Sequence, residues 1–214
     1  MTPQLSAYGD HALLLQWPST EFSLEISDRI HDLSARLRES GDFTEVVPGY
    51  DSLLCVFDLG RHSMSFIESQ VKAQLAKKSA KPKPNSKTID IPVHYGGPDG
   101  PDMAVICEAS GLSETEVIKR HSAEAYRVCM MGFIPGFTFL SPAPKSLHHP
   151  RLETPRAKVP AGSIGIANWQ TGIYGLESPG GWQIIGRTPL SIFDANRKAP
   201  FLLKAGDQIR FIPQ

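Results

Sequence analysis

The sequence has 214 residues, of which 41% are hydrophobic and 21% charged, and its 22 basic and 22 acidic residues give a formal net charge of zero. This composition is typical of one large or two small globular domains, and a neutral chain offers no overall field for nucleic acid or an anionic membrane. No apolar run approaches the roughly 20 residues that span a bilayer, and the N-terminus lacks the basic segment and cleavage site of a signal peptide, so we expect a cytoplasmic protein.

Strand and helix patterns alternate along the first third of the chain. There is room for a strand near Leu5, and the apolar run at residues 11–17 predicts a second strand. An amphipathic helix over residues 23–41 follows, with apolar side chains at helical spacing and Gly41 at its end. Two short strands around a Pro-Gly turn (44–58) and a second helix (64–75) complete the segment. This order predicts a small ferredoxin-like α/β sandwich built on a split βαβ unit.

A charged, Pro-rich stretch separates this segment from the rest of the chain. Residues 77–87 consist mainly of Lys, Pro and Ser, and none of them is suited to a core. Such a stretch is typical of an exposed linker. We therefore predict an N-terminal α/β domain over residues 1–80, a linker over 81–88 and a second domain over 89–214.

The second domain begins with helices and continues as strands. An alternating strand over residues 88–97 enters a Gly-rich turn, and two short helices follow within residues 101–125. Gly111 ends the first helix, and Ser113 with Glu116 predicts a capping box for the second. From Tyr126 onward, short strands separated by Gly and Pro continue to the end, as in a β-barrel. The fold class expected for the whole chain is α+β.

Several functional classes are disfavoured by the motifs. The two short helices resemble a helix-turn-helix, but Glu114 and Glu116 open the second helix, where they would repel DNA phosphates. The chain contains neither a phosphate-binding loop of the GxxxxGK type nor a GxSxG elbow. His148 and His149 have no third ligand nearby, so we expect a solvated loop and no metal site. The three widely spaced cysteines are expected to be buried structural thiols.

The stretch MGFIPGF, residues 131–137, places two glycines and a proline inside an apolar run. Gly132 and Gly136 either bend the chain or let another group approach the bare backbone, and Pro135 interrupts any regular ladder. One interpretation is a corner or bulge of the barrel. The other is a pocket wall against which a substrate lies.

Polar side chains gather between residues 151 and 188. Arginine can hold a carboxylate or phosphate through two hydrogen bonds, and Gln, Thr and Tyr can fix the orientation of a bound molecule. A pocket and a set of ordinary surface loops explain this pattern equally well. His121, at the end of the capped helix, is either a general base or a cap of the helix C-terminus. The polar residues concerned are Arg151, Arg156, Lys158, Gln170, Thr171, Tyr174, Arg187 and Thr188.

A series of motifs in order along the chain resembles one known family. They include IPVHYGGPDGPD, GFIPGF, TPRAKVPAGSIGIANWQTGIY and SPGGWQIIGRTPLSIFD. The sequence is similar to the family of the B subunit of bacterial 5-oxoprolinase, which also includes allophanate hydrolase subunit 1 and the histidine-kinase inhibitor KipI, and which has a carboxyltransferase-type domain. The resemblance covers nearly the whole chain. It implies a small N-terminal α/β domain followed by a cyclophilin-like β-barrel.

The resemblance also implies which residues bind the substrate and favours the pocket-wall interpretation of residues 131–137. The expected catalytic residues are Arg187, which matches the family motif GRTPL, and His121, which is a candidate only because of its position at the end of the capped helix. The expected substrate-binding residues match the family motifs or lie beside them: Gly132, Phe133, Pro135, Gly136, Phe137, Arg151, Arg156, Gln170, Thr171, Tyr174 and Thr188.

The activity implied is ATP-dependent opening of 5-oxoproline to glutamate, by a complex with a C-type and an A-type subunit. ATP, with Mg²⁺ as its counter-ion, is then shared with a partner subunit, and this chain is expected to be inactive alone. Two alternatives remain open. A KipI-like protein would bind and inhibit a sensor histidine kinase without catalysis. A prolyl isomerase is suggested only by the barrel analogy.

Overall fold

The computed structural model describes residues 2–19, 21–77 and 88–214. These residues form two compact units, which fall within Met1–Asn85 and Ser86–Gln214. The predicted linker lies outside the described residues except for Thr88, which begins the first strand of the second unit. No helix in the described ranges is both long and apolar enough to cross a membrane.

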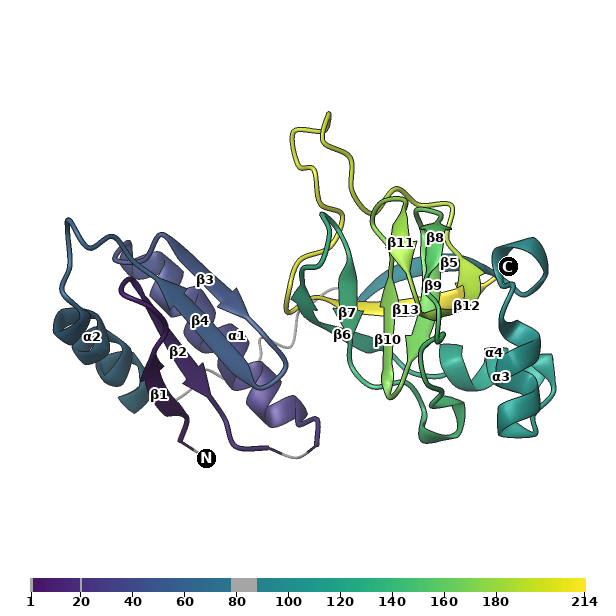
Figure 1. The fold of residues 1–214 in the computed structure, drawn as a ribbon, viewed down its shortest axis with the longest axis horizontal. Coiled ribbons are helices and arrows are strands. Elements are labelled where there is room, and N and C mark those ends of the chain that lie inside the picture. Colours follow the sequence, from purple (N-terminus) through teal and green to yellow (C-terminus); the bar gives the residue numbers. More distant parts are fainter. Residues whose placement is uncertain (1, 20, 78–87) are drawn as a thin grey trace. The chain divides into compact units, whose positions relative to one another are not determined.

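The first unit is a four-stranded sheet packed against two helices (Figure 1). The strands pair in the order β1-β2-β4-β3, each antiparallel to its neighbour, so β4 lies between the two strands that α1 connects. This is the split βαβ unit expected from the sequence, with β1 beside β2. The bounds are β1 Gln4–Ala7, β2 Ala12–Gln16, α1 Leu24–Ser40, β3 Glu45–Pro48, β4 Ser52–Val56 and α2 Met64–Ala76.

The helices of this unit follow the predicted apolar spacing. The hydroxyl of Ser23 accepts a hydrogen bond from the amide of Ile26 and caps α1, which buries the apolar face predicted from the sequence. Both helices contribute to one apolar cluster with alternate residues of the strands, among them Leu13, Leu15 and Leu53. Cys55 is part of this core, and its burial raises the pKa of the thiol to about 12.

The second unit is a closed barrel of seven strands in the order β10-β7-β6-β13-β5-β12-β9 (Figure 1). β13 runs parallel to β5, and the other neighbouring strands are antiparallel. β8 and β11 form a separate ladder. The bounds are β5 Thr88–Tyr95, η1 Gly97–Asp99, α3 Met103–Ser110, α4 Glu114–Ser122, β6 Tyr126–Met131, β7 Thr138–Leu140, η2 Lys145–Leu147, β8 Arg156–Val159, β9 Ser163–Ala167, β10 Gln170–Ile173, β11 Ser178–Gly180, β12 Gln183–Arg187 and β13 Gln208–Pro213.

Two apolar clusters cover opposite faces of the barrel strands. Ile164 and Ile166 of β9 belong to a large cluster that also takes in residues of α3 and α4. Between them, Gly165 faces the other way, where a Cβ would lie 2.9 Å from that of Trp182. Trp182 belongs to a smaller cluster with Phe137 and Tyr174. The closed ring of strand pairs confirms the expected barrel, and the helices present beside the strands in both units confirm the α+β class.

The two helices of this unit lie where the sequence predicts them. α3 ends at Gly111, and the hydroxyl of Ser113 accepts a hydrogen bond of 3.3 Å from the amide of Glu116 at the start of α4. The Glu116 carboxylate lies 3.7 Å from Lys119 and 3.8 Å from Arg120 of its own helix, so only the Ser113 half of the predicted capping box is observed.

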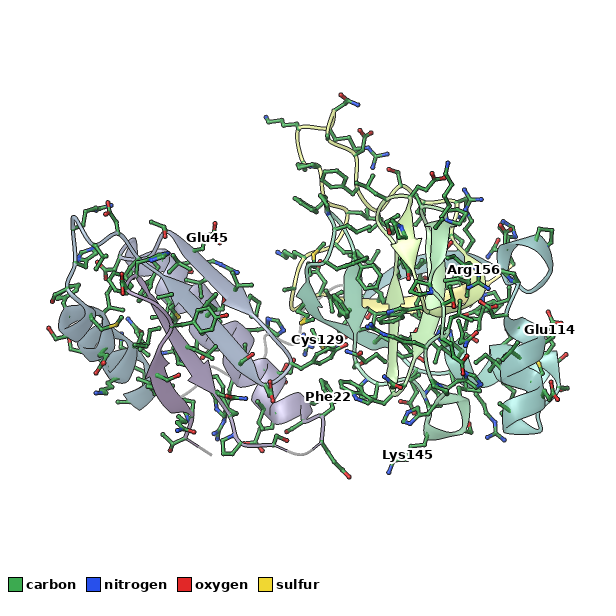
Figure 2. The ribbon with its side chains drawn as sticks, viewed as in Figure 1. Phe22, Glu45, Glu114, Cys129, Lys145 and Arg156 are labelled. Atoms are coloured by element: carbon green, nitrogen blue, oxygen red, sulfur yellow. The ribbon has the colours of Figure 1, made fainter. Side chains whose placement is uncertain are left out.

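The remaining cysteines are free thiols, as expected. Cys129 is buried and Cys107 is partly buried. Cys129 lies on β6, as labelled in Figure 2.

Candidate functional site

A pocket of about 380 Å³ lies where β9 begins and β10 ends. Its walls come from η1, from the turn before β9, from the segment after β10 and from the segment after β12. The last of these segments leads into the excursion between β12 and β13, which projects from the barrel in Figure 1. The pocket volume lies in the range of about 300–1,000 Å³ typical of small-molecule sites.

Close backbone packing at Gly162 builds one wall of the pocket. The Gly162 amide donates to the carbonyl of Tyr174 at 2.8 Å, and its own carbonyl accepts from the amide of Thr188 at 2.9 Å. Gly162 has φ +82°, and a Cβ there would lie 2.4 Å from the Thr188 carbonyl oxygen. A side chain at this position would therefore separate the two segments, so glycine fixes the position of Thr188 at the pocket.

The GFIPGF segment is the turn between β6 and β7, so it is a corner of the barrel. Gly136 has φ +77°, and a Cβ there would lie 2.5 Å from the Cβ of Phe193 and 3.3 Å from the Cα of Gly175. Phe193 and Gly175 line the pocket, whereas Gly136 does not. The close approach predicted at this glycine is therefore made by neighbouring protein segments. The turn therefore packs against two residues of the pocket wall through Gly136, which does not itself line the pocket.

Two further features of this turn follow from its aromatic residues. Phe133 has φ +68°, which is unfavourable for a bulky side chain, and is 67% exposed. Phe137 is buried and packs edge-on against Phe133 and Tyr174. Neither phenylalanine lines the pocket.

Arg187 lines the pocket and contributes a guanidinium group to it. Its Nε donates to the carbonyl of Ala161 at 3.0 Å, and its NH1 lies 3.8 Å from Oδ1 of Asp99. Its side chain is 46% exposed. In the ladder between β12 and β5, Arg187 lies opposite His94, which also lines the pocket. The pocket therefore combines a guanidinium, a carboxylate and an imidazole.

His94 and Asp99 are not among the residues predicted from the sequence. Both flank the Gly-rich turn after β5, which the sequence marks only as the end of a strand. The sequence signal that could have identified this site is the presence of a His and an Asp on either side of a Gly-rich turn.

Arg156, labelled in Figure 2, is already engaged by a buried carboxylate. Its NH2 donates to Oδ1 of Asp102, whose Oδ2 accepts from the backbone amide of Ile184 at 2.6 Å. Asp102 is only 4% exposed. This network connects β8, the start of α3 and β12, and Arg156 does not line the pocket. The structure therefore gives Arg156 a connecting role.

Arg151 lies apart from the pocket, beside the ring of Trp182. Its guanidinium carbon is 5.9 Å from the centre of the Trp182 ring, a cation–π distance. Tyr174 is buried beside the same tryptophan, and this burial raises its pKa, while the amide of Trp182 and the charges of Arg151 and Arg156 act to lower it. Arg151 and Tyr174 therefore belong to the small aromatic cluster, and neither lines the pocket.

His121 is fully buried against the barrel. Its Nδ1 lies 2.8 Å from the hydroxyl of Tyr95, and its Nε2 lies 2.9 Å from the hydroxyl of Thr171. Thr171 donates its only hydroxyl hydrogen to the carbonyl of Gly165, so Nε2 must be the protonated nitrogen and Nδ1 must accept from Tyr95. Burial lowers the pKa of His121 from 6.5 to about 3. The imidazole is therefore neutral and lies apart from the pocket.

Gln170 lies at the far end of the β9–β10 hairpin. It pairs with Ala167 beside the turn of that hairpin, whereas the pocket lies at the other end of the same two strands. Of the predicted site residues, the structure thus places Arg187 and Thr188 in the pocket. The other predicted residues that are described above do not line the pocket: Gly136 packs against two of its residues, Phe133 is exposed, Gln170 lies at the far end of the hairpin, and the neighbouring networks contain His121, Thr171, Arg151, Arg156, Phe137 and Tyr174.

The pocket has one guanidinium, that of Arg187, and the Asp99 carboxylate lies 3.8 Å from it. The sequence has no phosphate-binding loop of the GxxxxGK type. Within the described ranges, no group of three or more His, Cys, Asp or Glu side chains is arranged to hold a metal ion. His148 and His149 instead make contacts with nearby backbone carbonyl oxygens, at 2.9 and 3.0 Å.

Comparison with known proteins gives a consistent result over nearly the whole chain. The B subunit of 5-oxoprolinase from Escherichia coli O157:H7 is 41% identical over 206 residues, which are 96% of this chain and 94% of that protein. The protein of the same name from Bacillus subtilis is 36% identical and covers 98% of this chain and 92% of its own length.

A solved structure, that of TTHA0988, has the same fold. It superposes with a TM-score of 0.83 at 34% identity over 95% of this chain, and this chain spans 40% of its length. The family model for the carboxyltransferase domain, subdomain C and D, matches residues 3–203. The chain therefore belongs to the carboxyltransferase-domain family, subdomains C and D, whose members include the B subunit of 5-oxoprolinase.

Proposed function

We propose that this chain is the B subunit of a cytoplasmic 5-oxoprolinase that couples ATP hydrolysis to the opening of 5-oxoproline to glutamate. The observation that carries this proposal is the 41% and 36% identity, over more than nine-tenths of each chain, to proteins named as the B subunit of 5-oxoprolinase. The same names favour this function over inhibition of a histidine kinase.

Arg187 is the residue proposed to bind the substrate carboxylate. It is the guanidinium in the pocket and is about half exposed, so its NH groups can meet a ligand. Guanidinium binds carboxylates through two parallel hydrogen bonds. Arg156 is less suited to this role because it already binds Asp102, and the pocket therefore depends on Arg187 for anion binding.

The proposed complex also contains an A-type and a C-type subunit. The hydrolysis of 5-oxoproline is uphill, so ATP must activate the lactam oxygen before water attacks. This pocket has one guanidinium and a neighbouring carboxylate, which is too little positive charge for a triphosphate. ATP and its Mg²⁺ are therefore expected to lie mainly on a partner subunit, and this chain alone is expected to be inactive.

The test is reconstitution of the three purified proteins. We expect release of glutamate from 5-oxoproline only when all three subunits and ATP are present, with one ADP formed per glutamate. Omitting each subunit in turn is the control. Glutamate release by this chain alone, or no release from an assembled complex, would contradict the proposal.

A further inference from the structure

Two oppositely charged side chains of the pocket, those of Arg187 and Asp99, lie close together without a hydrogen bond between them. Arg187 NH1 and Asp99 Oδ1 are 3.8 Å apart, which is too long for a hydrogen bond. Arg187 donates from Nε to the backbone, and its NH groups remain for a ligand. Among the described residues, no group donates a hydrogen bond to the Asp99 carboxylate, which is 35% exposed and lines the pocket.

By comparison, two other ion pairs of the same unit are saturated, which means that direct hydrogen bonds join their charged groups. Asp90 and Arg210 form two parallel hydrogen bonds of 3.2 and 3.1 Å on the barrel surface. Asp102 is bonded to Arg156 and also accepts from the backbone. The Asp99–Arg187 pair is thus loosely joined, and both residues line the pocket.

Adjacent opposite charges with free hydrogen-bonding capacity suit a ligand that itself carries both charges. An α-amino acid has its ammonium and carboxylate on one carbon atom, so a carboxylate and a guanidinium side by side can bind it at both groups. A simple dicarboxylate would satisfy Arg187 but would be repelled by Asp99. The pair therefore selects for a zwitterion.

The proposed reaction produces such a zwitterion, and this inference rests on that proposed function. In the net hydrolysis, the lactam C–N bond breaks and a C–O bond to water forms. The carbon becomes the γ-carboxylate, and the nitrogen keeps its hydrogen and takes both hydrogens of the water to become the α-ammonium. We propose that Asp99 accepts the lactam N–H of 5-oxoproline and then the α-ammonium of glutamate, while Arg187 binds the α-carboxylate of both.

The test compares glutamate with glutarate, which has the same two carboxylates but no ammonium, by calorimetric binding to the assembled three-subunit complex. Wild-type complex is expected to bind glutamate at least about tenfold more tightly than glutarate. In Asp99→Asn, glutamate binding weakens by about tenfold, because the amide cannot pair with an ammonium charge, while glutarate binding is unchanged or tighter.

The matched control is Asp90→Asn, which removes the same charge from a saturated surface pair and is expected to change neither ligand's affinity. Equal binding of glutamate and glutarate by wild type, or no loss of glutamate affinity in Asp99→Asn, would overturn the inference. Undetectable glutamate binding would overturn it as well. The Tm of both variants checks that they are folded.

Turnover separates this inference from the proposed function. If the complex binds glutamate through Asp99 but releases none from 5-oxoproline, the proposed function fails and the amino-acid site stands. If the complex turns over 5-oxoproline and Asp99→Asn leaves glutamate binding intact, the function stands and the role of Asp99 is wrong.

Discussion

His121 and Thr171 are joined by a hydrogen bond of 2.9 Å inside the barrel unit, between Nε2 of the imidazole and the threonine hydroxyl. The bond belongs to a chain that runs from Tyr95 through His121 and Thr171 to the carbonyl of Gly165. It connects α4 to β5, β9 and β10, so two residues expected at a substrate site instead hold a helix against the barrel.

Thr171→Val should destabilise the barrel by about 1–3 kcal/mol, because the substitution keeps the shape of the side chain but leaves the buried Nε2–H of His121 without its partner. Hydrogen exchange of the β9 and β10 amides measures this stability. Thr171→Ser keeps the hydroxyl and should cost less. Equal protection in wild type and Thr171→Val would show that the bond contributes nothing.

The low pKa of His121 predicts an acid-sensitive barrel. Burial lowers this pKa from 6.5 to about 3, so between these pH values the unfolded chain binds a proton that the folded chain does not. Stability therefore falls as the pH drops from 6.5 towards 3, by on the order of 5 kcal/mol from this residue, and is unaffected by it above pH 6.5.

Urea unfolding between pH 7.5 and 4 measures this dependence. His121→Gln removes the titrating group. Its unfolding should therefore take up as much as one proton fewer than that of wild type below pH 6.5, so the free energy of unfolding of the variant should fall less steeply as the pH decreases. Parallel pH profiles for the two proteins would contradict the assignment.

Arg187→Ala should reduce kcat/KM of the reconstituted complex by about 30-fold, equivalent to about 2 kcal/mol, if the guanidinium binds the substrate carboxylate in the pocket. Arg210→Ala removes a similarly exposed arginine, 52% against 46%, and should leave kcat/KM unchanged. Unaltered activity of Arg187→Ala in an intact complex would remove Arg187 from the site.

Gly136→Ala should destabilise the barrel by more than about 1 kcal/mol, because the residue has φ +77° and a new Cβ would lie 2.5 Å from that of Phe193. A Cβ added at Gly132, in the same turn, would meet no surrounding atom within 4 Å, so Gly132→Ala is the matched control and should change the Tm little. Similar Tm values for the two variants would show that Phe193 moves aside freely.

Local sequence patterns predicted the secondary structure well. The apolar spacing of Ile30, Leu33 and Leu37 identified α1, and the hydroxyl of Ser113 marked the start of α4. These signals act within a few residues, so no knowledge of the fold was required. The closed barrel followed from the run of short strands together with the family resemblance.

The site was predicted less completely because it depends on contacts between distant strands. Gln170 and Thr171 are adjacent in sequence, yet one lies at a hairpin end and the other is buried against His121. Arg187 and His94 are far apart in sequence, yet they pair across β12 and β5. The alternation of a strand shows that neighbouring side chains point to opposite faces, but not which face a pocket lies on.

The parallel pairing of β5 with β13 has a consequence for the order of folding. These strands lie near the two ends of the second unit and pair over six residues, from Thr88 with Gln208 to Val93 with Pro213. During synthesis, β5 leaves the ribosome long before its partner, so one of its edges stays open until the last strand emerges. The first unit needs no such distant partner and can fold while the barrel is still being translated. Loss of β13 would leave β5 and β6 each with an exposed edge and would favour aggregation over folding.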